Sequence, residues 1–165
     1  MYALAQLNLL FNYLNANKIS TEGPKFDFTN QTEIPHVTIQ LPVYNELYVM
    51  ERLLDNIVKL DYPSHKLEIQ VLDDSNDESI ESTAKQIKSL QKNGVDIKHI
   101  CRTNREGFKA GALKEGLKIA KGEFIAIFDA DFLPKSDWLK RTIPFFKDIK
   151  ICLLYTSPSP RDGRE

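Results

Sequence analysis

The chain has 165 residues, of which 42% are hydrophobic and 27% charged, and its formal net charge is −1. This length suffices for one domain with a substantial core, and the composition excludes a disordered chain. Near-neutral charge without clustered lysines gives no indication of nucleic-acid binding, so we expect no nucleic-acid partner. Cys101 and Cys152 have neither metal-ligand nor disulfide-framework spacing, and we expect Cys101 to be a buried thiol in a reducing, cytoplasmic setting.

Residues 1–17 carry no charge and are rich in apolar side chains. Gln6, Asn8 and two further asparagines interrupt them, so they form no continuous membrane span, and they lack the basic start of a secretory signal. The leucine spacing predicts an amphipathic helix. This helix could pack on the domain, lie at a membrane surface or end a longer membrane segment upstream, and we favour membrane association. Residues 18–35 are polar, contain prolines and are expected to form a linker.

The expected domain covers residues 36–150 and begins with a strand over 36–41, where Val, Ile and Leu alternate with polar residues. A loop over 42–46 leads to a helix over 46–60, with Asn45 as its N-cap. A second strand over 67–72 is followed by a helix that ends at Asn93-Gly94.

The same alternation continues with a strand over 95–101 and a helix over 107–120. The apolar run 124–128 predicts a strand buried on both faces, in the middle of a parallel sheet. A last helix starts at Ser136 and is kinked or ended near Pro144. Alternating strands and helices predict an open, mostly parallel α/β sheet whose strands all have their carboxyl ends at one edge.

Two acids, Asp129 and Asp131, directly follow the run 124–128. Carboxylates at positions i and i+2 can approach one divalent cation, and their hard oxygens suit Mg²⁺ or Mn²⁺. The alternative is that both are solvated turn residues that end a strand.

Further polar residues follow the first and second strands. Asp73 and Asp74 are predicted to face the ligand crevice, where a carboxylate accepts hydrogen bonds from a base or a ribose. The alternative role is helix capping, which we assign to Asp77. Tyr44 could stack on a base or be a packed surface aromatic.

Lys109 lies near the start of the helix over 107–120, among small residues that allow close approach of the backbone to a ligand or to the sheet. A helix start favours phosphate and Lys109 adds a cation, although Lys109 could simply be solvated. The glycine spacing fits neither a dinucleotide-binding loop nor a P-loop, so redox and P-loop NTPase functions are excluded.

Four motifs in this order resemble those of family 2 glycosyltransferases, and most of all those of processive cellulose-synthase-like glucan and mannan synthases. The motifs are Gln40–Glu46, Val71–Ser75, Gly107–Gly116 and Phe128–Phe132. The resemblance covers residues 36–150 and implies a GT-A fold with helices on both faces of the sheet. It also implies inverting transfer of a sugar from a UDP-sugar or GDP-mannose to a glycan or lipid acceptor hydroxyl, with Mg²⁺ or Mn²⁺.

The resemblance further implies roles for individual residues. It puts Asp129 and Asp131 at the metal, with Asp129 also at the donor, and the membrane in the full-length parent, with the catalytic domain on the cytoplasmic side. The residues implied to bind the nucleotide and the donor are Pro42, Tyr44, Glu46, Asp73, Asp74, Lys109 and Asp129.

The chain departs from the family at its end. The family's later Thr-Glu-Asp-like and Gln-x-x-Arg-Trp motifs do not occur, so no catalytic base can be named and the chain is expected to be a truncated, donor-binding part. The tail over 151–165 is interpreted as foreign or disordered.

One alternative function is a chain that binds nucleotide-sugar and metal without turnover. A sugar-phosphate nucleotidyltransferase lacks support because no glycine-rich loop follows the first strand, and a phosphatase lacks the usual Thr after Asp131.

Overall fold

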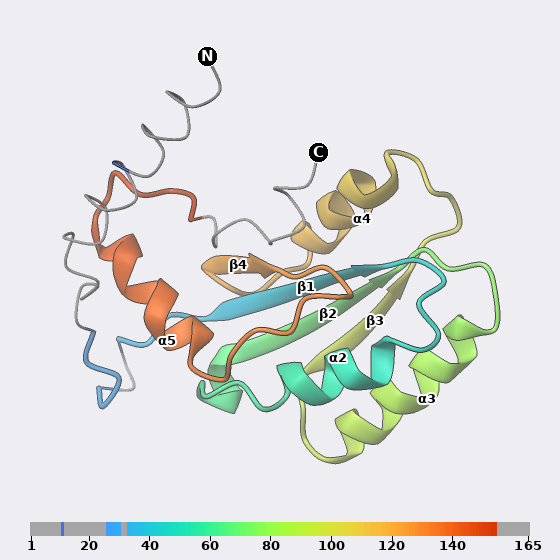
Figure 1. The fold of residues 1–165 in the computed structure, drawn as a ribbon, viewed down its shortest axis with the longest axis horizontal. Helices are drawn as coiled ribbons and strands as arrows, with labels where there is room; N and C mark the ends of the chain where they lie inside the picture. Colours follow the sequence, from blue (N-terminus) through green and yellow to red (C-terminus); the bar gives the residue numbers. More distant parts are fainter. Residues whose placement is uncertain (1–10, 12–25, 31–32, 155–165) are drawn as a thin grey trace. The chain divides into compact units, whose positions relative to one another are not determined.

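The computed structural model describes residues 11, 26–30 and 33–154. The chain divides into two compact units, one of residues 27–140 and one of residues 1–26 together with 141–165. The first unit contains all four strands of the described residues (Figure 1). Apart from residue 11, the predicted N-terminal helix lies outside the described residues, as do most of the predicted linker and the tail from residue 155 onward.

The four strands form one parallel sheet. They are β1 (Val37–Val43), β2 (Leu67–Asp73), β3 (Ile97–Cys101) and β4 (Phe124–Ile127), in the order β3-β2-β1-β4. The chain adds β2 and β3 on one side of β1 and then returns to place β4 on the other side (Figure 1). The predicted parallel α/β architecture is therefore confirmed. The strand order reverses between β1 and β4, and such a reversal is where open α/β sheets bind ligands.

The register brings three strand ends to the same level. Val43 lies opposite Asp73, and Asp73 lies opposite Cys101. Residues that follow β1, β2 and β3 therefore start from one edge of the sheet, which is the arrangement that parallel pairing dictates.

The position of β4 differs from the prediction. Among the described residues β4 is an edge strand, paired only with β1, and its last residue Ile127 is 49% exposed. A short apolar run has the same appearance in an interior strand and in an edge strand, because composition does not report the number of neighbours. Phe128, which follows the strand, is buried.

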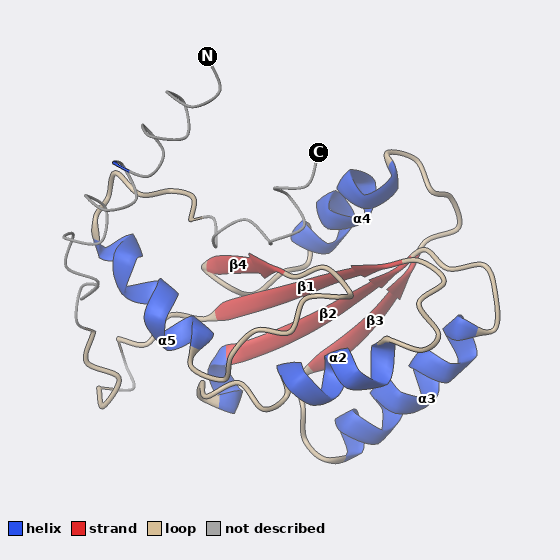
Figure 2. Cartoon of the chain, in the orientation of Figure 1, coloured by secondary structure: helices blue, strands red, loops and turns tan. Residues whose placement is uncertain are grey.

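Four α-helices follow the strands: α2 (Met50–Ile57), α3 (Ser79–Lys92), α4 (Phe108–Leu117) and α5 (Trp138–Thr142). Two 3₁₀ turns, η1 (Ser64–Lys66) and η2 (Ile143–Lys147), complete the set. Figure 2 shows α2 and α3 along one side of the sheet and α4 on the other, so both faces carry helices. α5 ends at Thr142, two residues before Pro144, which agrees with the prediction of a helix kinked or ended near this proline.

The two faces of β1 and β2 differ in polarity. One face consists of buried aliphatic side chains, among them Ile39, Leu41 and Val71. The other face carries buried polar side chains that pair with one another at hydrogen-bond distance. These pairs are Thr38 Oγ1 to Glu68 Oε2 at 2.7 Å and Gln40 Nε2 to Gln70 Oε1 at 3.0 Å. The alternation in the sequence therefore separates two buried faces, and it does not mark a solvent-exposed one.

Glu68 is the charged centre of the polar face. Lys98 Nζ and the backbone N–H of Lys121 donate to its carboxylate at 2.7 and 2.9 Å. Burial raises the pKa of Glu68, but the hydrogen bonds from Lys98, Lys121 and Thr38 outweigh burial and hold this pKa below its usual range. Glu68 thus links β1, β2, β3 and the segment before β4 under the helix α4.

Glycine lets α4 approach this polar face closely. A Cβ atom on Gly116 would lie 2.6 Å from Gln40 Nε2 and 2.7 Å from Gln70 Oε1. This approach of helix backbone to the sheet occurs at Gly116, which was not among the small residues named from the sequence. In the described part of the chain, no helix has the length and apolar character needed to cross a membrane.

Candidate functional site

A cavity of about 360 Å³ lies at the carboxyl ends of β1, β2 and β4, where the strand order reverses. This volume lies in the range of small-molecule sites. The lining residues are Pro42, Val43, Tyr44, Glu46, Leu72, Asp74, Arg105, Lys109, Ala112, Asp129, Ala130 and Asp131. All residues predicted for the site are in this set except Asp73. The parallel sheet therefore gathers side chains from four separate motifs around one space.

The acidic turn (Asp129–Asp131) is held in place by aromatic packing on either side of it. The rings of Phe128 and Phe132 stack with their centroids 5.5 Å apart, and Trp138 meets Phe128 edge-on at 4.9 Å. The N–H of Phe132 donates to the carbonyl of Asp129 at 3.0 Å, which closes the turn. The aromatic packing thus supports the turn from which Asp129 and Asp131 line the cavity.

Lys109, near the start of α4, forms an ion pair with Asp129. Their side chains are 52% and 58% exposed. Exposed ion pairs contribute little to stability because water screens both charges. The pair can therefore separate at small cost when a charged ligand enters the cavity. The predicted meeting of the lysine and the acids at one site is observed.

Asp74 lines the same cavity and is held by Arg102, a residue that the sequence analysis did not single out. Arg102 donates to both carboxylate oxygens of Asp74, through Nε at 2.8 Å and through Nη2. It also donates to the carbonyls of Glu106 and Phe108 at 2.9 and 3.0 Å. The hydrogen bonds to Asp74 raise the pKa of Arg102. One guanidinium therefore ties the end of β2 to the loop before α4.

Gly111 is required for this arrangement. A Cβ atom at this position would lie 1.9 Å from the carbonyl oxygen of Glu106 and 2.6 Å from Nη1 of Arg102. Gly107, directly before α4, has a φ of 70°, which glycine adopts without strain. The close approach at Gly111 is between the loop and its own helix, whereas the prediction named a ligand or the sheet.

A second arginine, Arg105, covers Tyr44. Its guanidinium carbon lies 3.5 Å from the centroid of the Tyr44 ring, a cation–π contact, and both residues line the cavity. Tyr44 is 39% exposed. The loop before α4 and the first turn of α4 thus bring two cations, Arg105 and Lys109, to the cavity, and only Lys109 was expected from the sequence. Arg102 and Arg105 lie between the end of β3 and the start of α4. This position at the carboxyl edge of the sheet was the sequence signal that could have revealed them.

Asp73 turns away from the cavity. Its Oδ1 accepts the N–H of Ser75 at 2.9 Å, and its Oδ2 lies 2.7 Å from Nε2 of His99. Burial raises the pKa of Asp73, but the hydrogen bonds from His99 and Ser75 outweigh burial and lower it. Both acids were predicted to face the crevice. Asp74 lines the cavity, whereas Asp73 does not. The role of Asp73 at the nucleotide stays a prediction.

Cys101 was expected to be buried, and this is wrong, because the residue is exposed. It is the last residue of β3, at the sheet edge opposite β4. Its Sγ lies 3.4 Å from Nε2 of His99. Although the residue is exposed, partial desolvation of its thiol and the nearby Asp73 and Asp74 raise the pKa of Cys101.

Asn45 was predicted to cap the helix after β1. In the structure it instead connects the loops that follow β1 and β2. The helix α2 starts at Met50 with Val49 before it, so Asn45 is not the N-cap. Asn45 instead has a φ of 57°, and its backbone N–H donates to Ser75 Oγ at 2.8 Å. Its side chain exchanges hydrogen bonds with Asn76.

Asp77 bonds to the start of α3, although the N-cap is Glu78 and not Asp77 as predicted. Its Oδ1 accepts the N–H of Ser79, the first residue of that helix, at 3.0 Å.

The acidic turn fits the implied divalent cation. Asp129 and Asp131 both line the cavity, and carboxylate oxygens are the ligands that Mg²⁺ and Mn²⁺ prefer. The cations Lys109 and Arg105 line the same space and would face an anionic group bound to that ion. The arrangement can therefore hold an anion and a divalent cation together.

Comparison with known proteins identifies relatives over the same region. The family model described as "Glycosyl transferase family 2" matches residues 38–163. The chain is 48% identical over 115 residues to a probable glucomannan 4-beta-mannosyltransferase 11 of Oryza sativa subsp. japonica, covering 67% of this chain and 20% of the relative. It is 45% identical over 115 residues to glucomannan 4-beta-mannosyltransferase 7 of Arabidopsis thaliana, covering 67% and 21%. The chain thus spans about a fifth of the length of the curated relatives it matches.

Solved structures agree with these relatives. The mannosyltransferase PcManGT from Pyrobaculum calidifontis, solved with GDP-Man and Mn²⁺, is 31% identical with a TM-score of 0.67, over 85% of this chain and 40% of that one. TarS from S. aureus, residues 1–349 solved with UDP, is 26% identical with a TM-score of 0.57, over 68% and 32%. The fold is of the GT-A type, as the resemblance implied. The chain belongs to glycosyl transferase family 2.

Proposed function

We propose that this chain forms the donor-binding part of an enzyme that transfers a sugar from a nucleotide-diphospho-sugar to an acceptor hydroxyl, with inversion, in glycan or polysaccharide synthesis. The observation that carries the proposal is the single cavity in which the acidic turn, Asp74, Lys109 and Tyr44 meet at the reversal of strand order. The names of the relatives favour GDP-mannose as donor, and a UDP-sugar is the other candidate.

We assign each residue of the cavity to one part of the donor, according to the charge and shape of its side chain. Asp74, fixed by Arg102, is oriented to accept hydrogen bonds from the base or the ribose. Tyr44, backed by Arg105, offers one face of its ring to the nucleoside. We assign Pro42 and Glu46 to the same wall of the cavity. Asp73 supports this wall by fixing the end of β2, and a direct contact with the nucleotide would require its carboxylate to leave His99.

Lys109 is assigned to the diphosphate, which would replace Asp129 as its partner. Asp129 and Asp131 would hold Mg²⁺ or Mn²⁺, and a bound ion of this kind neutralises negative charge on a departing diphosphate as a Lewis acid. Asp129 is then released from Lys109 to face the ion and the donor. We assign none of these side chains as the base for the acceptor hydroxyl, and we expect the catalytic base beyond residue 150.

The second candidate is binding without turnover. It is favoured by the absence of any base that we can name in the sequence of this chain. Both candidates require the same cavity and the same cation, and they differ in whether a nucleoside diphosphate is released.

Calorimetry on the 165-residue chain tests the proposal. GDP-mannose or a UDP-sugar should bind in the presence of Mn²⁺, and Asp131→Ala should abolish the Mn²⁺-dependent part of the binding while leaving the circular dichroism spectrum unchanged. Asp137→Ala, at an exposed acid outside the cavity lining, is the matched control. Equal Mn²⁺-dependent binding by Asp131→Ala and the unchanged chain would refute the metal role. Release of GDP or UDP on adding acceptor separates transfer from binding alone.

We also propose that the whole protein acts at a membrane, with this domain on the cytoplasmic side and a glycan or lipid as acceptor. The uncharged, leucine-rich residues 1–17 support this assignment. Co-sedimentation with lipid vesicles should decrease when residues 1–17 are deleted, and unchanged sedimentation would contradict it.

A further inference from the structure

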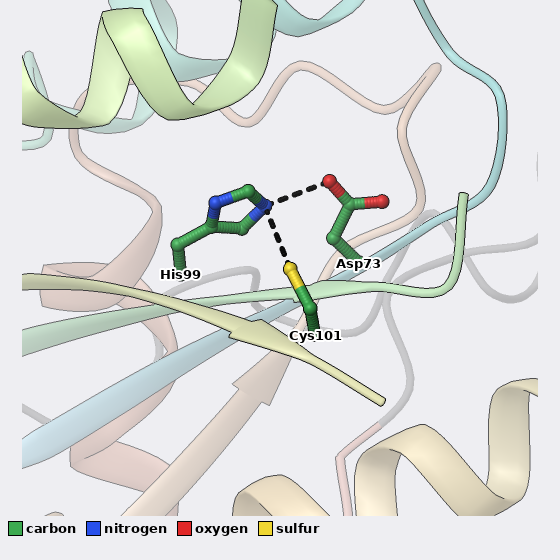
Figure 3. A group of neighbouring side chains, drawn as sticks. All are labelled: Asp73, His99 and Cys101. Carbon is green, nitrogen blue, oxygen red and sulfur yellow. Dashed lines mark hydrogen bonds and ion pairs between the residues drawn. The ribbon is translucent and has the colours of Figure 1, made fainter. Parts of the chain in front are cut away.

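Three side chains of different chemistry converge at the far side of the sheet from the acidic turn. They form the strand-end cluster (Asp73, His99 and Cys101), shown in Figure 3. Asp73 ends β2, and Cys101 lies opposite it at the end of β3. His99 precedes Cys101 by two residues, and residues two apart in a strand project from the same face of the sheet. The backbone of two paired strands therefore fixes the cluster.

The three potential ligand atoms lie within 4.8 Å of one another. His99 Nε2 is 2.7 Å from Asp73 Oδ2 and 3.4 Å from Cys101 Sγ, so the same ring nitrogen faces both partners. One ring nitrogen carries at most one hydrogen and cannot donate to both. A Cys-His-Asp nucleophile relay uses one ring nitrogen for the acid and the other for the nucleophile. The cluster therefore does not have relay geometry, whereas the mutual proximity of its three potential ligand atoms is compatible with one shared cation.

The donor set selects the cation. Imidazole nitrogen, thiolate sulfur and carboxylate oxygen are the ligands of Zn²⁺, whereas Mg²⁺ and Mn²⁺ prefer oxygen alone. In a tetrahedral zinc site, Zn–N of about 2.0 Å and Zn–S of about 2.3 Å place nitrogen and sulfur about 3.5 Å apart. The 3.4 Å between His99 Nε2 and Cys101 Sγ fits this value. Zn²⁺ would replace the hydrogen between His99 and Asp73 and lengthen that contact to about 3.4 Å.

The surroundings support a cation at this place. The N–H of Ser75 donates to Asp73 Oδ1 at 2.9 Å, which fixes the carboxylate and leaves Oδ2 toward the cluster. Such outer contacts orient metal ligands. Asp73 is 2% exposed, whereas Cys101 is exposed and gives a path from solvent.

We propose that Asp73, His99 and Cys101 bind one Zn²⁺ ion that clamps the ends of β2 and β3, with the fourth position taken by water. Binding releases the hydrogens from the thiol and from the His99–Asp73 contact to solvent, because zinc ligands are deprotonated. The site is separate from the donor cavity, since none of the three residues lines it. Asp74, the next residue after Asp73, lines the donor cavity.

Metal binding to the full 165-residue chain tests the proposal. Zn²⁺ is titrated in competition with a chromogenic chelator, and Co²⁺ is used as a spectroscopic substitute. We expect one bound ion per chain, a near-ultraviolet thiolate-to-cobalt absorption band, and a higher melting temperature with Zn²⁺. Cys101→Ser and His99→Gln should each weaken Zn²⁺ binding by about 100-fold or more, because even the loss of an outer contact costs about 10–100-fold. The band should be absent from Cys101→Ser.

Two matched variants keep the test specific. Cys152→Ser removes the other exposed thiol, and His65→Gln removes an exposed histidine of η1; both should leave the affinity and the band unchanged. Far-ultraviolet circular dichroism verifies the fold of each variant. Equal Zn²⁺ affinity in Cys101→Ser and the unchanged chain would overturn the proposal, as would loss of the band in Cys152→Ser.

The acidic turn provides the last control. Asp131→Asn should keep the cobalt band and the Zn²⁺ affinity even though its Mn²⁺-dependent donor binding is lost. A loss of Zn²⁺ affinity in Asp131→Asn would place the ion at the acidic turn, which offers oxygen ligands and no thiolate, and would overturn the proposal. Because these measurements do not depend on sugar transfer, failure of the proposed enzymatic function would leave their outcome unaffected.

Discussion

The acidic turn and the strand-end cluster both gather potential cation ligands at the carboxyl edge of one sheet, but they differ in chemistry and in burial. Asp129 and Asp131 are exposed, offer oxygen alone and follow the edge strand β4. Asp73, His99 and Cys101 offer oxygen, nitrogen and sulfur and stand at the paired ends of β2 and β3.

The difference in burial has a physical consequence. The partner of the acidic turn, Lys109, is itself half exposed, so their ion pair can separate when a ligand enters. Asp73 is almost fully buried and is held by two hydrogen-bond partners. We therefore expect a cation at the acidic turn to come and go with a ligand, and the proposed zinc ion at the strand-end cluster to stay bound.

The first and largest predicted effect concerns Arg102, which holds Asp74 at the donor cavity. Arg102→Leu removes both hydrogen bonds to a carboxylate that is 5% exposed, and it should lower the free energy of unfolding by about 3 kcal/mol, the lower end for breaking a mostly buried pair. Urea denaturation measures the change. Arg52→Leu, at an exposed arginine of α2, is the control and should change the free energy of unfolding by less than about 0.5 kcal/mol. A similar small change for Arg102→Leu would contradict the buried-pair interpretation.

Lys109→Met tests the exposed ion pair between Lys109 and the acidic turn. Because the pair with Asp129 is exposed, we expect the free energy of unfolding to change by less than about 1 kcal/mol. Affinity for the nucleoside diphosphate with Mn²⁺ should nevertheless fall by at least about tenfold, since a charge-assisted hydrogen bond contributes about 1.5–3 kcal/mol. Calorimetry with GDP and UDP measures this loss. Lys114→Met, an exposed position on the same helix, should bind as the unchanged chain does, and equal losses in both variants would show that only general charge matters.

The smallest predicted effect is on the pH dependence of stability and concerns Glu68. This residue belongs neither to the acidic turn nor to the strand-end cluster. Its pKa in the folded chain lies below the ordinary 4.5, so between these two pKa values the unfolded chain binds more protons. The contribution of Glu68 to stability is therefore complete above about pH 4.5 and is lost as pH falls through its folded pKa. Urea midpoints from pH 6 to pH 3 should fall less steeply for Glu68→Gln. Glu78→Gln, at an exposed position, should keep the original slope, and the same slope in Glu68→Gln would contradict the assignment.

The sequence was sufficient for the parallel sheet and for most of the cavity lining. Strand–helix alternation dictates that the carboxyl ends of the strands share one edge, so Tyr44, Asp74, Lys109 and the acidic turn could be expected at one site before any coordinates. Local periodicity also gave the approximate positions of the strands, because each strand pattern is contained in a few neighbouring residues.

Tertiary structure decided what depends on contacts between distant segments. The apolar run at 124–127 carries no information on the number of its neighbours, and pairing with β1 alone makes it an edge strand among the described residues. Asn45 was read as a helix cap because capping is a local rule, whereas Ser75 and Asn76 bind it across the sheet edge.

The strand-end cluster is the clearest case of this division. The sequence by itself determined that Asp73 ends one strand and that His99 and Cys101 lie two residues apart in another. Cysteine spacing gave no sign of a metal site, because the third ligand is 26 residues before the histidine. Only the register, which sets Asp73 opposite Cys101, brings the three donor atoms within reach of one ion, since strand pairing is a long-range interaction that no local pattern encodes.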